Sequence, residues 1–220
     1  MHPVERKPMM PENRSLLEKY LKQNNIEGSL EDALRAFQMY MEELLRWNKV
    51  INLTAIEEES GIIIKHFIDS LTPLKFIGGS DFVLDIGSGA GFPGLPIKIA
   101  RPSLKIVMID ARLKKTNFIS TMIGLLKMKG ATALHQRAEE KNFREIMGKS
   151  FDVVISRASF SLQEFAELSM PYMKDRGKLI AMKSKKEEDK PALIGLKQTD
   201  EFVTNLPDGS YRRILVFEKT

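Results

Sequence analysis

The 220-residue sequence contains no cysteine, and this absence excludes several kinds of site. Without thiols there are no disulfides, no thiolate metal sites and no cysteine nucleophile. The three histidines (His2, His66 and His135) are scattered, so they do not predict a zinc site, and we expect no bound metal. No apolar run approaches the roughly 20 residues of a membrane-spanning helix, and the first ten residues lack the apolar segment of a signal peptide. We therefore expect a cytoplasmic protein without a membrane partner.

The residues that are present fit a folded domain with a full apolar core. Hydrophobic residues make up 43% of the chain and charged residues 29%. A length of 220 residues suits one large domain, or one domain with an extension. Lysine and arginine number 34 against 29 acidic residues, which gives a formal charge of +5. This mildly basic charge is compatible with a polyanionic partner, although many proteins without one carry similar charge.

The N-terminal third of the chain has the apolar periodicity of helices. Leucines and aromatic residues recur at helical spacing, and Ser29 with Asp32 resembles a capping box at one helix start. We therefore predict an N-terminal helical extension over residues 1–78 that packs on a core domain over residues 79–220. The predicted helices cover roughly residues 12–23, 30–45 and 58–76.

Beyond residue 79, short apolar runs alternate with amphipathic segments. This alternation predicts an α/β fold with a mostly parallel sheet and helices on both faces. The last two runs are joined by the turn Pro207-Asp208-Gly209, so we expect an antiparallel hairpin at the sheet edge. Helices are expected to begin near Gly94, Arg112, Glu139 and Gln163. The seven predicted strands are Phe82–Ile86, Lys105–Ile109, Ala131–His135, Phe151–Ile155, Lys178–Met182, Glu201–Asn205 and Ile214–Phe217. A charge run at residues 183–190 reads as a solvated face or loop.

The first predicted strand leads into a glycine-rich loop, VLDIGSGAGFPG, at residues 83–94. Its glycines fall at positions 87, 89 and 91, whereas a dinucleotide fingerprint needs the third glycine at position 92, which is Phe92. Pro93 removes an N–H donor from the start of the next helix, which makes this loop less suited to binding a pyrophosphate. Asp85 at the strand end suits a cationic amino-acid ligand better. The alternative is a plain glycine-rich turn.

The next two strand ends add polar groups to the same sheet edge. Asp110 ends the second strand, and its carboxylate can accept hydrogen bonds from both hydroxyls of a ribose, or cap the following helix. Ala138 and Glu139 follow the third strand, where an adenine ring could lie, although Glu139 can also be an early-turn helix acid. Taken together, the three strand ends predict a pocket for S-adenosylmethionine.

These residues lie in stretches that resemble a known family, the bacterial 16S (small-subunit) ribosomal RNA methyltransferase G family, also called glucose-inhibited division protein B. The resemblance implies a class I (Rossmann-like) methyltransferase fold with an N-terminal helical cap. It also implies methyl transfer from S-adenosyl-L-methionine to guanine N7 of 16S ribosomal RNA, with S-adenosyl-L-homocysteine as the product. The similar stretches are WNKVINLTAI (47–56), KHFIDSL (65–71), VLDIGSGAGFPGLPIKI (83–99), RAEE (137–140), FDVVISRA (151–158) and LIAMKSK (179–185).

The resemblance also implies which residues hold the cofactor. They are Gly87, Phe92, Asp110, Ala138, Glu139 and Arg157, to which the glycine loop adds Gly89. The implied partner is small-subunit ribosomal RNA or the 30S subunit, and we expect a monomer. Ser184 and Ile214 depart from the usual family residues, glycine and histidine, which leaves the shape of the substrate side open.

The stretch DVVISRAS at residues 152–159 bears on the mechanism. Enzymes that methylate exocyclic amines place an Asn/Asp-Pro-Pro-aromatic turn after this strand, and here the turn is absent. Guanine N7 already carries an in-plane lone pair and no proton, so we predict catalysis by positioning, without a general base. Arg157 is assigned to anchoring cofactor or nucleotide, with a salt bridge to Glu139 or Asp85 alone as the alternative.

Other readings stay open at this point. A class I methyltransferase could act on a 2′-hydroxyl or a small molecule, and a non-catalytic module could bind S-adenosylmethionine in ribosome assembly. His66 and Asp69 could line the cleft or only pack two helices together. Trp47 and Phe92 could stack on a base, although Trp47 also suits the core. Candidate phosphate contacts are Lys65, Arg101, Arg112, Lys114, Lys115 and Lys183.

Overall fold

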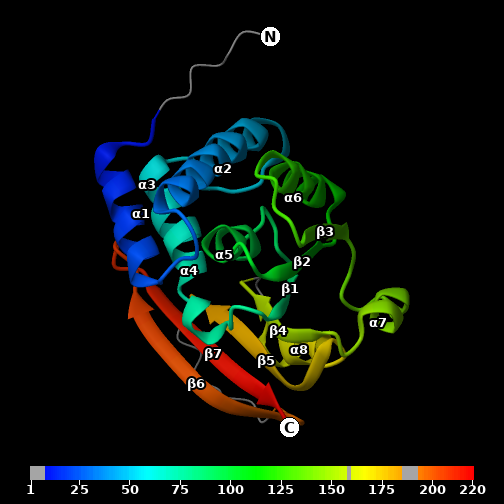
Figure 1. Cartoon of the computed structure of the whole chain (residues 1–220). Coiled ribbons are helices and arrows are strands. Elements are labelled where there is room, and N and C mark those ends of the chain that lie inside the picture. The colour runs from blue at the N-terminus through cyan, green and yellow to red at the C-terminus, as the bar shows by residue number, and fades with distance from the viewer. Residues whose placement is uncertain (1–7, 158–159, 185–192) are drawn as a thin grey trace.

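The computed structural model describes residues 8–157, 160–184 and 193–220, and a seven-stranded sheet forms its centre (Figure 1). The strands are β1 (Phe82–Ile86), β2 (Lys105–Asp110), β3 (Ala131–His135), β4 (Phe151–Ser156), β5 (Met173–Lys183), β6 (Leu196–Asn205) and β7 (Tyr211–Lys219). Their order in the sheet is β3-β2-β1-β4-β5-β7-β6. Strands β1 to β5 pair in parallel, and β7 is antiparallel to both β5 and β6. The predicted sheet with its antiparallel terminal hairpin is confirmed.

The central strands are buried on both faces. In β4, Val153 and Ile155 belong to one buried apolar cluster and Val154 to a second, because successive side chains of a strand point to opposite faces. Strands covered on both faces have nearly continuous apolar sequences. This arrangement explains why the run at residues 153–155 shows no polar alternation.

Helices cover both faces of the sheet, as predicted (Figure 1). One face carries α1 (Pro11–Gln23), α2 (Leu30–Ile51), α5 (Gly94–Ala100) and α6 (Leu113–Leu125), and the other carries α7 (Lys141–Met147) and α8 (Leu162–Ser169). The predicted cap at Ser29 is present, since its hydroxyl accepts a 3.2 Å hydrogen bond from the amide of Asp32. Within the described residues, no helix combines the length and the apolar character that a membrane crossing requires.

The third predicted helix is shorter than expected and irregular. It consists of α3 (Glu59–Ile62), the π-helical segment η1 (Ile63–Ile68) and α4 (Asp69–Leu71), and a separate 3₁₀ turn, η2 (Leu74–Phe76), follows. The break falls at Thr72 and Pro73, because a proline has no backbone N–H to continue the helical hydrogen bonds. Apolar spacing alone does not show this break or the π-helical turn.

Other boundaries also differ from the sequence prediction. Strand β6 begins at Leu196 and β7 extends from Tyr211 to Lys219, so the weak run at residues 201–205 is only the second half of β6. As the edge strand, β6 is largely exposed, and its polar residues hide the strand pattern. Helix α7 begins at Lys141, two residues later than expected. Residues 185–190 of the predicted charge run lie outside the described residues.

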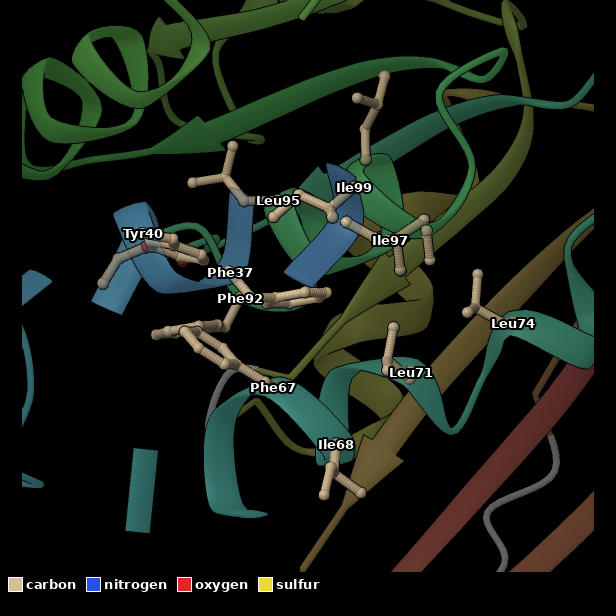
Figure 2. Close-up of a cluster of buried hydrophobic side chains, with 14 of the residues drawn as sticks. Phe37, Tyr40, Phe67, Ile68, Leu71, Leu74, Phe92, Leu95, Ile97 and Ile99 are labelled. Atoms are coloured by element: carbon tan, nitrogen blue, oxygen red, sulfur yellow. The ribbon is translucent and has the colours of Figure 1, made fainter. Parts of the chain in front are cut away.

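The N-terminal helices and the sheet share one apolar cluster (Figure 2). Tyr40 of α2 stacks on Phe67 of η1 and on Phe92 of the β1–α5 loop, at centroid distances of 5.2 and 5.4 Å. The ring of Phe118 in α6 is 6.1 Å from Tyr40. The helical extension therefore packs directly on the sheet-bearing part of the chain, while the domain boundary near residue 78 stays a prediction.

Candidate active site

A cavity of about 590 Å³ opens at the carboxyl ends of β1, β2 and β3. Its volume is in the range of small-molecule sites. In open α/β sheets, ligands bind at this edge where the strand order reverses, and here β1 lies between β2 and β4. The walls come from the loops after the three strands and from the start of α8. They include Gly87, Asp110, Arg112, Lys115, Ala138, Glu139, Phe160 and Glu164.

The loop after β1 takes its shape from glycines. Gly87 and Gly89 have φ angles of 73° and 60°, a region that residues with side chains rarely adopt. Gly87 lines the cavity. Gly89 is not part of the wall, but its amide donates a 2.9 Å hydrogen bond to Oδ2 of Asp110. The loop is thereby tied to the end of β2.

Asp110 is held firmly at the cavity wall. Its side chain is almost fully buried, and Oδ1 accepts a 2.9 Å hydrogen bond from the amide of Arg112. Each carboxylate oxygen accepts one backbone N–H and keeps a second acceptor site. Asp110 thus bonds the chain ahead of α6 and still has capacity for the two hydroxyls of a ribose.

The loop after β3 forms the next part of the wall. Ala138 is buried, and its carbonyl accepts hydrogen bonds from the hydroxyl of Tyr172 and from Nε of Arg144. Glu139 is exposed, with an ion pair to Arg137 at 3.4 Å. Ala138 and Glu139 both line the cavity, beside Gly87 and Asp110.

Asp85 is completely buried beneath the glycine loop. Its Oδ2 accepts a 2.9 Å hydrogen bond from the amide of Gly94, while Oδ1 has no partner among the described residues. Burial raises the pKa of Asp85 to about 7, against the opposing effect of the Gly94 hydrogen bond. An unpaired buried carboxylate oxygen is costly, and a cationic ligand would relieve that cost.

The two aromatic candidates for base stacking are both packed inside the protein. Phe92 is only 5% exposed and does not line the cavity, because its ring lies between Tyr40 and His66. The centroid distance from Phe92 to His66 is 4.4 Å. Trp47 is half-buried and meets Phe118 edge to face at 5.6 Å. The resemblance assigned Phe92 to the cofactor, and that assignment stays a prediction.

Arg157, just after β4, also lies outside the cavity wall. Its guanidinium forms an ion pair with Asp69 of α4 at 3.1 Å, so neither Glu139 nor Asp85 is its salt-bridge partner. Asp69 is fully buried and also accepts a 2.8 Å hydrogen bond from Nη2 of Arg212 in β7. The alternative of a salt bridge to Glu139 or Asp85 alone is wrong, because the N-terminal helices place the carboxylate of Asp69 at the end of β4. The assignment of Arg157 to cofactor or nucleotide stays a prediction.

His66 completes this buried polar group. Nη1 of Arg157 donates a 2.8 Å hydrogen bond to the carbonyl of Lys65, and Nη2 lies 3.2 Å from Nδ1 of His66. Burial, followed by the Arg157 cation, lowers the pKa of His66 to about 3. Asp69 and His66 therefore connect the helical extension to the strand tips. The two residues thus contact Arg157 beyond β4, in addition to any packing between helices.

The candidate phosphate contacts separate into two groups. Arg101 donates to the carbonyls of Asn24 and Asn25, at the end of α5 remote from the cavity, and Nζ of Lys183 donates a 2.6 Å hydrogen bond to the carbonyl of Phe160. These two side chains have structural partners. Lys65 forms an ion pair with Asp208 at 3.5 Å. The remaining candidates are Arg112, Lys114 and Lys115, of which Arg112 and Lys115 line the cavity. Among the described residues, no group of three side chains could hold a metal ion.

The sequence analysis missed the α8 side of the cavity, which is formed by Phe160, Glu164 and Leu168. The sequence did contain a signal, since Ser161 with Glu164 three residues later is a capping-box pattern. In the structure the hydroxyl of Ser161 accepts a 3.1 Å hydrogen bond from the amide of Glu164 and caps α8. A cap at that position places the first turn of α8 at the carboxyl end of β4. The pairing of Asp69 with Arg212 has no comparable local signal, since 143 residues separate the partners.

Comparison with known proteins gives the same fold and adds a family. A methyltransferase from Aquifex aeolicus, described as dependent on SAM, superposes with a TM-score of 0.57 at 20% identity, over 77% of this chain and 97% of that one. TrmN from Thermus thermophilus has a TM-score of 0.58 at 16% identity, over 70% of this chain and 48% of that one. At these identities the likeness shows the fold alone.

Sequence relatives are much more similar. The ribosomal RNA small subunit methyltransferase G of Lachnoclostridium phytofermentans is 41% identical over 192 residues, which cover 83% of this chain and 79% of the relative. The protein of the same name from Desulfitobacterium hafniense is 37% identical over 96% of this chain and 92% of its own length. Residues 33–204 match the family described as rRNA small subunit methyltransferase G, GidB. The chain therefore belongs to the rRNA small subunit methyltransferase G family.

Proposed function

We propose that the protein transfers a methyl group from S-adenosylmethionine to N7 of a guanine in small-subunit (16S) ribosomal RNA. The observation that carries this proposal is the cavity at the ends of β1 to β3, in a chain whose family acts by its name on ribosomal RNA. The cofactor, when bound, supplies a methyl group on a positively charged sulfonium. All other contributions come from the residues of the chain.

The residues around the cavity fit this cofactor. Asp110 keeps acceptor capacity for two ribose hydroxyls, and Ala138 with Glu139 lies beyond it, where a purine ring would be held. On the β1 side, Gly87 lets a ligand approach the backbone closely. The unpaired Oδ1 of Asp85 suits the ammonium group of an amino acid, and this carboxylate lies buried beneath the glycine loop rather than in the cavity wall. The proposed contacts thus follow the three strand ends in order.

A guanine N7 acceptor agrees with the state of the two titratable side chains that contact Arg157 among the described residues, since neither is free to take a proton. His66 has a pKa of about 3, and both of its ring nitrogens have partners. Asp69 is paired with Arg157 and Arg212. Since N7 carries a lone pair and no proton, alignment of nucleophile and methyl group is the required contribution. The Asp69 carboxylate also offsets the charge of Arg157 as positive charge develops on guanine.

The test uses the whole chain with tritiated S-adenosylmethionine and small ribosomal subunits from a strain that lacks the gene. Label at N7 of one guanine, located by mass spectrometry, is the expected result. Label on a ribose 2′-oxygen, or no label on any ribosomal RNA, would refute the proposal.

Asp110→Ala provides a test of the cofactor site. The variant is expected to bind S-adenosylmethionine about 10-fold to 100-fold more weakly, as for the loss of hydrogen bonds to a charged acceptor. Isothermal calorimetry measures this affinity. Wild-type affinity in the variant would show that Asp110 does not hold the ribose.

A further inference from the structure

Thr54 lies half-buried in the loop between α2 and α3, and its hydroxyl oxygen is 2.7 Å from Nε2 of His66. The His66 ring stacks on Phe92 in the loop after β1, and Nδ1 lies 3.2 Å from the guanidinium of Arg157 just after β4. Through one side chain, Thr54 is therefore connected to the tips of two neighbouring strands. These tips belong to the sheet edge at which the cavity opens.

The direction of the hydrogen bonds in this chain of groups follows from Arg157. Nδ1 of His66 lies 3.2 Å from Nη2 of Arg157 and 3.2 Å from the carbonyl of Lys65. That carbonyl already accepts a 2.8 Å hydrogen bond from Nη1 of Arg157, and a hydrogen on Nδ1 would face an N–H of the guanidinium, which only donates. We therefore assign Nδ1 as the acceptor of Nη2. With a pKa of about 3, His66 is neutral at physiological pH, and a neutral imidazole that accepts at Nδ1 carries its hydrogen on Nε2. His66 therefore donates its Nε2 hydrogen to the hydroxyl oxygen of Thr54.

The same oxygen accepts a second hydrogen bond, from the backbone amide of Ile56 at 3.1 Å. Two donors fill both acceptor sites of a hydroxyl oxygen, so the hydroxyl of Thr54 can act towards anything else only as a donor. No acceptor for its hydrogen lies within bonding distance among residues 8–157, 160–184 and 193–220. The fold thus fixes a donor on the side of the helical extension and leaves it without an internal acceptor.

We propose that Thr54 is a specificity-determining residue that donates its hydroxyl hydrogen to O6 of the guanine that is methylated; this inference rests on the proposed function. The Hoogsteen edge of guanine presents two acceptors, O6 and N7. N7 must keep its lone pair free for the methyl group, so O6 is the acceptor available to Thr54. Adenine carries an amino donor in place of O6, and a donor facing a donor disfavours it.

The experiment compares Thr54→Val, which removes the hydroxyl in a similar shape, with Thr54→Ser, which keeps it. Wild-type enzyme first locates the methylated guanine. Small subunits are then rebuilt with 2-aminopurine at that nucleotide, which retains N7 and lacks O6. We expect wild type and Thr54→Ser to prefer guanine over 2-aminopurine in kcat/KM. Thr54→Val should lose about 10-fold of this preference, the value of one hydrogen bond.

The ratio of kcat/KM for guanine to kcat/KM for 2-aminopurine, taken within each variant, removes any general loss of activity. Comparing this ratio between variants also removes the difference in intrinsic reactivity of the two bases. Thermal unfolding monitors the structural cost of the substitution, and calorimetry should show wild-type affinity for S-adenosylmethionine, because Thr54 does not line the cavity. Thr54→Val with an unchanged preference for guanine overturns the role of Thr54 and leaves the proposed function intact. Wild-type enzyme without label at any guanine N7 overturns the proposed function itself.

Discussion

At the residue scale, Asp69 is a buried carboxylate that pairs with two arginines. Its carboxylate is fully buried and binds Arg157 at 3.1 Å and Arg212 at 2.8 Å. The three residues come from α4, from the end of β4 and from β7. Removing one partner of a buried ion pair leaves uncompensated charge, which typically costs about 3–5 kcal/mol. Asp69 therefore stabilises the junction between the helical extension and the sheet.

Asp69→Asn keeps the shape of the side chain and removes its charge. We expect the free energy of unfolding to fall by about 3 kcal/mol, as for a broken buried pair, and S-adenosylmethionine to bind more weakly because Arg157 is no longer anchored. Urea unfolding and calorimetry measure the two effects.

Asp152→Asn is the matched control. Asp152 pairs with Lys174 at 2.7 Å and accepts a 2.9 Å hydrogen bond from the amide of Phe82, at the opposite end of β4 from Arg157. This variant should lower stability and leave cofactor affinity unchanged. Equal loss of affinity in both variants would mean that Asp69 has only a general structural role.

Asp85 predicts a pH dependence of stability. Its pKa is about 7 in the folded protein, against a usual value of 3.8. The folded state therefore retains a proton that the unfolded state releases, so Asp85 destabilises the fold increasingly between about pH 4 and pH 7. Asp85→Asn should flatten stability over this window and raise the free energy of unfolding at pH 8 by a few kcal/mol. Urea unfolding at pH 5 and pH 8 tests this. An equal change in the free energy of unfolding between the two pH values in wild type and variant would contradict it.

At the element scale, the start of α6 has an unusual distribution of charge. Its N-cap is Arg112, Lys114 and Lys115 lie in the first turn, and no acidic residue is present there. Cations at a helix N-terminus are unfavourable, by about 0.3–1 kcal/mol each. Arg112 and Lys115 line the cavity. The unfavourable cations therefore stand at the sheet edge where a polyanionic substrate would approach.

Lys114→Glu should therefore separate stability from RNA binding. We expect the free energy of unfolding to rise by about 0.5 kcal/mol, because an acid suits the first turn of a helix. RNA affinity should fall, and the slope of its logarithm against that of salt concentration should shrink by about 0.7–0.9 for one lost phosphate contact.

Lys129→Glu makes the same charge change on an exposed residue beyond the other end of α6. It should leave RNA affinity nearly unchanged. If the two variants weaken RNA binding equally, net charge rather than the start of α6 governs binding.

Prediction of the elements succeeded where local chemistry was sufficient. The cap at Ser29 and the apolar run of β4 each act within a few residues, and both were identified correctly. Prediction failed where tertiary contacts decide. Edge strand β6 pairs along its whole length with β7, and the π-helical turn at residues 63–68 presents the Lys65 carbonyl to Arg157. Neither the pairing of β6 nor the π-helical turn produces a regular apolar spacing in the sequence.

At the scale of the whole molecule, the N-terminal helices complete the hydrophobic core. Phe37, Tyr40 and Phe67 from these helices pack with Phe92 from the β1–α5 loop in one cluster (Figure 2). Without residues 1–78, this face of the sheet and of helices α5 and α6 would be exposed to water. A large exposed apolar surface favours aggregation over a stable monomer.

The fragment of residues 79–220 is therefore expected not to fold by itself. The full chain should unfold in one cooperative transition in urea, while the fragment should show no cooperative transition and should expose apolar surface to a fluorescent dye. A fragment that unfolds cooperatively and binds S-adenosylmethionine would show that the core domain is independent of the helical extension.

Local sequence features were enough to predict the fold class and to place the cavity at the carboxyl ends of β1, β2 and β3. Glycines with positive φ and carboxylates at strand ends are local features, and parallel strands bring their carboxyl ends to one edge. The partners of Arg157, in contrast, depend on contacts between distant parts of the chain. The carboxylate of Asp69 lies 88 residues away along the chain, and folding of the helical extension against β4 and β7 brings it within 3.1 Å. The same packing directs His66 to Thr54 and fixes a hydrogen-bond donor that no sequence spacing reveals.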